Sequence, residues 1–276
     1  MAFWTTVLLS ASISAIAAIG LFLQIRSGQL NVGMAVFAGV GGFSTGVLST
    51  RGGLPPALTI PLAAALGALV GGVFSALTLR LHHWFLAVTT LGLSVAAVSG
   101  VGQFELLGGP LGLSAIRVVS SAWPILLSLG VTFAVALAID RSAVGLAVRA
   151  TGDDQVLAQV FGVRVKRLRV LIFALGSAMA ALSGALHAHR FGVYQPTDLG
   201  FHPSLLLFVY VIVGGKKNVW GPALGTFFLF VVPELIHITP ETELVVFGAL
   251  MMLVAVAVPN GLAGALGALA ARRLAR

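Results

Sequence analysis

Three uncharged polar side chains interrupt a long apolar stretch near the beginning of the chain. Ser27, Gln29 and Asn31 alternate in the sequence SGQLNVG, which lies between two apolar runs. In an extended segment alternate residues share one face, so these three would lie together while Leu30 and Val32 face the packing. Hydroxyl and amide groups donate and accept hydrogen bonds, so this face could bind a neutral or zwitterionic solute.

The same stretch predicts a broken helix near 27–33. A break exposes backbone N–H and C=O groups that lipid cannot satisfy, so it is tolerated only where protein buries it or where it lines a cavity. We therefore expect Ser27, Gln29 and Asn31 to lie beside a translocation path. A plain loop next to Arg26 is the alternative. Whether Gln29 and Asn31 contact a solute or only satisfy the broken backbone stays open.

A second group of residues predicts a short helix over 153–161. Thr151 and Asp154 have the spacing of a capping box, with Asp in the position usually held by Glu. Asp153 and Asp154 also favour a helix N-terminus through the helix dipole. Gly162 can end the helix because glycine tolerates the left-handed backbone of a C-terminal cap.

One face of this expected helix is apolar, and the other carries two glutamines. The apolar positions recur at the spacing of a single helix face: Val156, Leu157, Val160 and Phe161. A short helix must bury such a ridge somewhere. The residues are equally consistent with packing on the membrane surface or on the protein's own bundle, and with insertion into a groove of a second protein.

Enzymatic chemistry finds no support in the sequence. The chain has no cysteine, which excludes disulfides and thiolate metal sites, and it has no GxSxG, phosphate-binding loop, HExxH or paired-carboxylate motif. His187 and His189 stand beside Arg190 at a predicted span end, where we expect interfacial anchoring. His82 and His83 are interpreted in the same way. We expect no catalytic residue, no metal site and no cofactor bound by this chain.

The composition is that of a multi-pass membrane protein. Of the 276 residues, 58% are hydrophobic and 9% are charged, against about 25% charged in soluble domains. We expect one all-α transmembrane domain over 1–276, a helical bundle of about eight to ten spans whose first span is retained. The expected spans are 3–25, 33–50, 55–79, 84–104, 121–139, 170–189, 203–214, 219–238 and 243–258.

Charge placement orients these spans. The segment 140–169 carries nine charged residues, six of them basic, so the positive-inside rule makes it a cytoplasmic loop. The net charge of +8 therefore indicates loops on one side of a membrane and not nucleic-acid binding. The side on which the chain starts depends on whether 27–33 is a loop or lies within the membrane. No charged residue is predicted in mid-span, where ion-coupled carriers often keep a carboxylate, so a partner should supply the energy for any transport.

Several stretches follow one another in the order of one known family. They are SGQLNVGMAVFAGVGGF, GGPLGL, GLAVRATGDDQVLAQVFGVRVKR with the span after it, FGVYQPTDLGF, VIVGGKKNVWGPALG and FVVPELI. Together, over most of 27–236, they resemble the LivM-type permease subunits of branched-chain amino acid ABC importers. The chain departs from the family pattern at GGKKN, where Lys216 and Lys217 replace a GGLGS-like turn, and at Leu111, where a polar residue is common.

The resemblance implies a permease in the cytoplasmic membrane of a prokaryote, surrounded by lipid. Such a subunit pairs with a LivH-type permease and stands on two cytoplasmic ATPases, which hold the ATP and Mg, while an external solute-binding protein delivers the amino acid. It also implies that the cytoplasmic loop docks on an ATPase through Asp153, Asp154, Leu157, Ala158, Phe161 and Gly162. Related importers take urea, amides or other amino acids. The rival function is a self-contained secondary carrier or channel for a small neutral solute.

Overall fold

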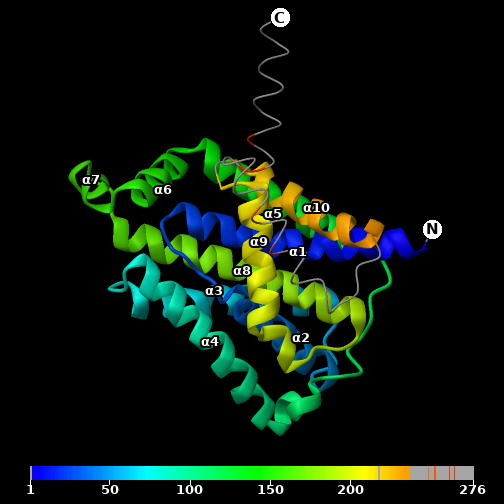
Figure 1. Ribbon diagram of the computed structural model, residues 1–276. Helices are drawn as coiled ribbons and strands as arrows, with labels where there is room; N and C mark the ends of the chain where they lie inside the picture. Colours follow the sequence, from blue (N-terminus) through cyan, green and yellow to red (C-terminus); the bar gives the residue numbers. More distant parts are fainter. Residues whose placement is uncertain are drawn as a thin grey trace, which may run out of the picture.

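The chain folds into a bundle of α-helices (Figure 1). The computed structural model describes residues 2–216 and 218–236 and, beyond these, Gly248, Met252, Gly261 and Gly264. Within these residues there is no strand, and the isolated bridge found there pairs Leu113 with Tyr194. The all-α prediction is therefore confirmed.

Among the described residues, five helices are long and apolar enough to cross a membrane. They are α1 (Ala2–Arg26), α3 (Pro56–Thr78), α4 (His83–Gln103), α5 (Trp123–Arg141) and α8 (Val165–Phe191). The described residues also form three shorter apolar helices: α2 (Met34–Thr50), α9 (Phe201–Gly214) and α10 (Trp220–Ile236). The connections contain α6 (Ala143–Asp153), α7 (Gln155–Val160) and three 3-10 turns, η1 (Glu105–Leu107), η2 (Gly109–Leu111) and η3 (Pro196–Leu199).

Each predicted span up to 219–238 is helical in the described residues, whereas the predicted span 243–258, apart from Gly248 and Met252, lies outside them. One boundary needs correction, because α8 begins at Val165 and so contains Arg169. Arg169 was expected in a connection but is a buried residue within the helix. Its guanidinium donates to the carbonyl of Leu79 at 3.5 Å, a partner at the end of α3 that the linear sequence does not reveal.

Helix α8 is the centre of the bundle and packs along α1, α2 and α3. The contacts run through small residues, with Gly20 against Gly176 and Gly41 against Ala181. A Cβ atom at Gly41 would collide with the carbonyl of Ala181. Small residues let helix backbones approach closely, which is the main source of helix association where lipid removes the hydrophobic driving force. The broken segment between α1 and α2 is thereby held against a rigid central helix.

The outer helices expose apolar surface. Less than a quarter of the apolar window of α3, α4 or α5 is buried inside the chain, so these faces suit lipid or a second membrane subunit. Helices α6 and α7 instead project beyond the bundle, past the end of α1 opposite the N-terminus (Figure 1). Arg26, at that end of α1, pairs with Asp140. The break therefore starts on the same side as the loop 140–169, and α1 starts on the opposite side.

Candidate functional site

The chain breaks between α1 and α2, where the sequence predicts a break. Gly28 in this segment has a φ of +76°, in the left-handed region that favours glycine. Ser27, Gln29 and Asn31 are each at most 2% exposed. The break is therefore surrounded by protein and is neither a loop in bulk solvent nor a lipid-facing helix.

Gln29 ties the break to two other helices. Its Nε2 donates to the carbonyl of Arg169 at 2.9 Å and to the hydroxyl of Ser27 at 2.8 Å. Its Oε1 accepts from the hydroxyl of Ser75 at 3.2 Å. Arg169 belongs to α8 and Ser75 to α3, so one side chain joins three elements. With these partners the amide group has little hydrogen-bonding capacity left.

Asn31 satisfies the other end of the break. Its Nδ2 donates to Oε1 of Gln24 at 2.8 Å, and its Oδ1 accepts from the amide of Gly33 at 3.0 Å. Gln24 in turn donates to the carbonyl of Phe173 in α8 at 3.0 Å. The side-chain amides of Asn31 and Gln24, which lipid could not satisfy, are thus paired within the protein.

The predicted orientation of the apolar neighbours is wrong. Leu30 and Val32 are partly exposed, whereas the polar side chains face the packing. The reason is that the hydrogen bonds of the break are made inward, to α3 and α8. In this structure the side chain of Asn31 accepts from a backbone amide of the break, whereas that of Gln29 bonds to Ser27, α3 and α8. Solute contact by Ser27, Gln29 or Asn31 stays a prediction.

Gln29→Leu should therefore act on stability. The carbonyl of Arg169 and the hydroxyl of Ser75 would lose partners in an apolar setting, which should cost about 1–3 kcal/mol and lower the melting temperature in detergent by roughly 2–4 °C per kcal/mol. Gln103→Leu, at the exposed end of α4, is the matched control and should leave the melting temperature unchanged. An unaltered melting temperature with lost transport would instead make Gln29 a solute contact.

Helix α7 begins later than predicted, and the capping box is wrong. Asp154 is itself the N-cap, because its Oδ1 accepts from two backbone amides of the first turn of α7 at 2.8 and 3.0 Å. Thr151 is buried in α6, which ends at Asp153, and does not cap α7. An extended backbone at Asp154 (φ −149°) separates the two helices. Gly162, at φ +82°, ends the segment as expected.

The apolar face of α7 is not covered by the described part of the chain. The exposed fractions run from 53% to 79% over Val156, Leu157, Val160 and Phe161. Ala158, on the opposite face, is buried against the chain itself. Packing of the ridge on the protein's own described bundle is therefore excluded, which leaves the membrane surface or the groove of a partner. Asp153 and Gly162 are exposed beside the ridge.

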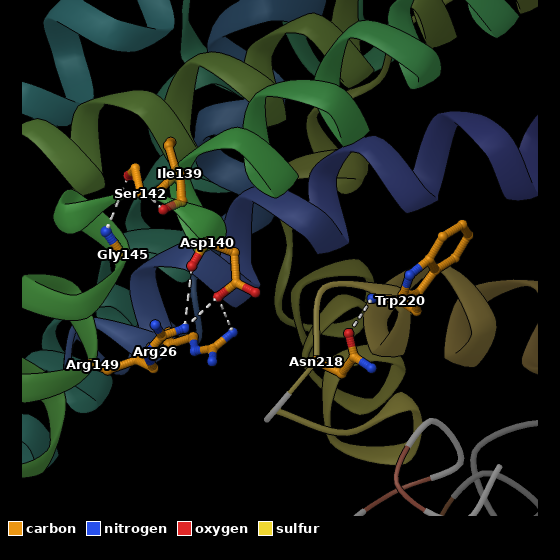
Figure 2. Close-up of polar contacts among 8 residues, drawn as sticks. All are labelled: Arg26, Ile139, Asp140, Ser142, Gly145, Arg149, Asn218 and Trp220. Carbon is orange, nitrogen blue, oxygen red and sulfur yellow. Dashed lines mark hydrogen bonds and ion pairs between the residues drawn. The ribbon is translucent and has the colours of Figure 1, made fainter. Parts of the chain in front are cut away.

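A charged cluster that the sequence did not reveal joins this loop to α1. Nη1 of Arg26 lies 2.9 Å from Oδ1 of Asp140, and Nη1 of Arg149 lies 2.8 Å from the same oxygen (Figure 2). Arg26 ends α1, Asp140 lies in the last turn of α5 and Arg149 lies in α6. The only signal in the sequence was opposite charge at two predicted span ends. A shared carboxylate fixes the orientation of all three helices at this end.

Next to the cluster, α6 touches the break directly. A Cβ atom at Gly152 would collide with the carbonyl of Arg26 and would lie 3.4 Å from the amide nitrogen of Gly28. Lys216 and Asp153 line a cavity of about 470 Å³ beside this contact. The projecting helices and the broken segment are thus in mechanical contact. A shift of α6 would press on the backbone of the break.

His189 has a structural role, so its expected interfacial placement is wrong. The residue is buried, with Nε2 at 2.7 Å from the hydroxyl of Thr59 and Nδ1 at 2.8 Å from the carbonyl of Arg117. Because a carbonyl only accepts, Nδ1 is the donor to Arg117. The ring thus joins α8 to α3 and to the connection before α5. No group of three or more side chains suited to a metal ion occurs in the part of the chain that the structure describes.

Together these features define a class of protein: a multi-pass helical membrane protein with a buried helix break and an apolar helix displayed outside the bundle. The chain belongs to the family described as "Branched-chain amino acid transport system / permease component", which it matches over residues 3–255. The resemblance of its motifs to this family is thereby confirmed.

Individual relatives support the same family. The chain is 25% identical over 271 residues to the high-affinity branched-chain amino acid transport system permease protein LivM of Escherichia coli K12, covering 86% of this chain and 64% of that protein. A probable LivM of Methanocaldococcus jannaschii is 27% identical over 238 residues, covering 74% and 67%. LivH of Salmonella typhimurium LT2 is 34% identical over 140 residues, covering 49% and 45%. The chain thus spans about two thirds or less of these relatives' lengths. No solved structure matches it significantly.

Proposed function

We propose that the chain is the membrane permease subunit of an ATP-binding-cassette importer for branched-chain amino acids or similar small polar solutes. The observation that carries this proposal is the family match over nearly the whole described bundle, residues 3–255. The LivM relatives are named as permease proteins of high-affinity branched-chain amino acid transport systems, which supports the solute class. The low content of charged residues, 9% of the chain, suits a path for a solute that carries no net charge.

The proposed assembly has three kinds of partner besides lipid. Similarity to both LivM and LivH proteins supports a second, LivH-type permease. Two cytoplasmic ATPases hold ATP and Mg, so this chain needs no cofactor and carries no catalysis of its own. An external solute-binding protein delivers the solute. Relatives in two bacteria and one archaeon support the cytoplasmic membrane of a prokaryote as the location.

Coupling to the ATPases runs through the loop 140–169 in this proposal. The exposed side chains of Leu157 and Phe161 enter an apolar groove, and Asp154 holds the short helix in shape through its cap. Ala158 supports α7 from its buried side, and Asp153 and Gly162 frame the two ends of the docking helix. Closure of the ATPases then moves α7 and α6, and the contact of α6 with the break transmits the motion to the bundle.

The test is transport by reconstituted vesicles. With the second permease, the ATPases and the binding protein present, we expect leucine uptake that requires ATP hydrolysis and stops when the ATPases are omitted. The purified chain alone under a proton or sodium gradient should not transport leucine. Uptake by the chain alone, driven by an ion gradient, would establish the secondary carrier instead.

A further inference from the structure

A second polar site lies toward the end of the bundle opposite α6 and α7. It is a cavity of about 200 Å³ bounded by α1, α2, the outer half of α8, η3, α9 and α10. At ~30 Å³ for each water molecule, this space holds about seven waters or a solute of similarly few non-hydrogen atoms. The cavity reaches from the connection after α8 to Ala35, in the first turn of α2. It therefore leads from the outer side toward the start of the helix that follows the break.

One wall of the cavity carries a carboxylate with a free oxygen. Oδ2 of Asp198 accepts from the amide of Gln195 at 2.9 Å and so caps η3. The other oxygen of Asp198 accepts no hydrogen bond from the described residues, and the side chain is only partly buried. A carboxylate held in place by one oxygen presents the other to a cation at a defined position.

Two hydrogen-bonding rings stand beside this carboxylate. The ring of Tyr194 packs edge-on against that of His187 at 5.7 Å between centroids, and both line the cavity. The hydroxyl of Tyr194 has no hydrogen-bond partner among the described residues. Burial and the charge of Asp198 raise the pKa of Tyr194, so the phenol keeps its proton and remains a donor. Nδ1 of His187 is buried without a partner in the described part of the chain, and such atoms usually have one.

Much of the remaining lining is apolar. It includes Ile13 and Ala17 of α1, Ala38 of α2, and Leu206 and Leu207 of α9, interspersed with the hydroxyl-bearing side chains of Ser14, Ser183 and Tyr210. A ligand that fits must therefore combine a cationic group, a group that accepts from a phenol, and a small aliphatic body. A zwitterionic α-amino acid with an aliphatic side chain has these three parts, whereas urea or a simple amide lacks the aliphatic body and the full charges.

We propose that this cavity is a transient holding site for an aliphatic α-amino acid, in which Asp198 binds the α-ammonium group and Tyr194, beside His187, donates to the α-carboxylate. The inference rests on the proposed import function and locates the solute within it. The holding site places solute selection in the outer half of the bundle. Gln29 and Asn31 then have a structural role, because their side chains hold the break in place. A site of this kind must be weak, since tight binding would prevent release toward the cytoplasm.

Because this chain has no cysteine, a single thiol introduced into it can be followed within the complete transporter. Ser14 lines the cavity, so Ser14→Cys places one thiol there, to be modified by a methanethiosulfonate reagent added from outside. L-leucine should slow this modification, whereas 4-methylpentanoate, which lacks the ammonium group, should not. Ser44→Cys, a half-buried position of α2 outside the cavity, is the control and should react at the same rate with and without leucine.

Asp198→Asn then tests the carboxylate itself. Asparagine keeps an oxygen that can cap Gln195, so folding is preserved while the charge is removed. We expect the leucine concentration that gives half-protection of the Ser14→Cys thiol to rise about tenfold or more. Glu105→Gln, at an exposed acidic position outside the cavity, is the control and should change this half-protecting leucine concentration by no more than about twofold.

Two results would overturn the holding site. In the first, the Ser14→Cys transporter imports leucine, but leucine does not slow modification of the thiol. In the second, Asp198→Asn leaves the protection by leucine unchanged. Failure of the import proposal looks different. In that case the unsubstituted assembly shows no ATP-driven uptake of leucine, whatever the reactivity of the thiol.

Discussion

Phe161→Asp should abolish both the association of the chain with the proposed ATPase subunits and ATP-driven uptake. Phe161 is 79% exposed and is the largest side chain of the α7 ridge, so its replacement removes little from the fold of the chain itself. In the assembled state the same side chain would be buried. Losing a buried aromatic ring costs about 1.5–3 kcal/mol, and forcing an unpaired carboxylate into an apolar groove costs several kcal/mol more. Affinity should therefore fall by roughly a hundredfold or more.

The measurement is co-purification of the ATPases with the tagged permease, followed by uptake in vesicles. Leu157→Asp should behave like Phe161→Asp, because the two residues share the ridge. Gln159→Asp places the same carboxylate on another exposed position of α7 and should leave both readouts near their normal values. Normal assembly and transport by Phe161→Asp would remove α7 as the coupling element and favour its placement on the membrane surface.

The features predicted from the sequence are those that local chemistry decides. The break near 27–33 was predictable because glycines and short polar residues interrupt an apolar run, and Gly28 does adopt a backbone that favours glycine. The end of the loop helix at Gly162 follows from the same chemistry. The apolar face of α7 was predictable from spacing alone, since residues on one face of a helix recur at fixed intervals.

The features that were missed depend on contacts between distant parts of the chain. Gln29 turned inward because the carbonyl of Arg169 and the hydroxyl of Ser75 lie there, and neither partner is visible from the SGQLNVG stretch. His189 is buried for the same reason, between Thr59 and the carbonyl of Arg117. The start of α7 was misplaced because two local signals competed.

Those competing signals show how helix starts are decided in such loops. Thr151 and Asp154 fit a capping box, but α6 continues through Thr151, so this residue is buried in a helix and cannot cap the next one. Asp154 alone then takes the role, with the extended backbone that a cap residue requires. The sequence motif was present, and the continuation of the preceding helix overruled it.

Gly152→Val should uncouple ATP hydrolysis from transport while leaving the assembly intact. The α7 ridge is untouched by this change, so docking on the ATPases should persist. At Gly152, however, α6 meets the carbonyl of Arg26 and the backbone of Gly28, with no space for a side chain. A valine would push α6 away from the break and disturb the shared carboxylate of Asp140. A loss of about 1.4 kcal/mol of coupling free energy corresponds to a tenfold fall in uptake. We expect uptake to fall by at least this factor.

The comparison that isolates this contact is Gly130→Val in α5, where a new Cβ would meet no atom within 4 Å; this variant should transport normally. Asp140→Asn is a second test variant, because it removes the charge shared by Arg26 and Arg149 without adding bulk. Like Gly152→Val, it should lower uptake. ATP hydrolysis by the assembled complex is measured beside uptake, with the melting temperature as a check on folding. If Gly152→Val folds, assembles and still imports leucine at the normal rate per ATP hydrolysed, the motion does not pass from α6 to the break, and the ATPases must drive the bundle through another contact.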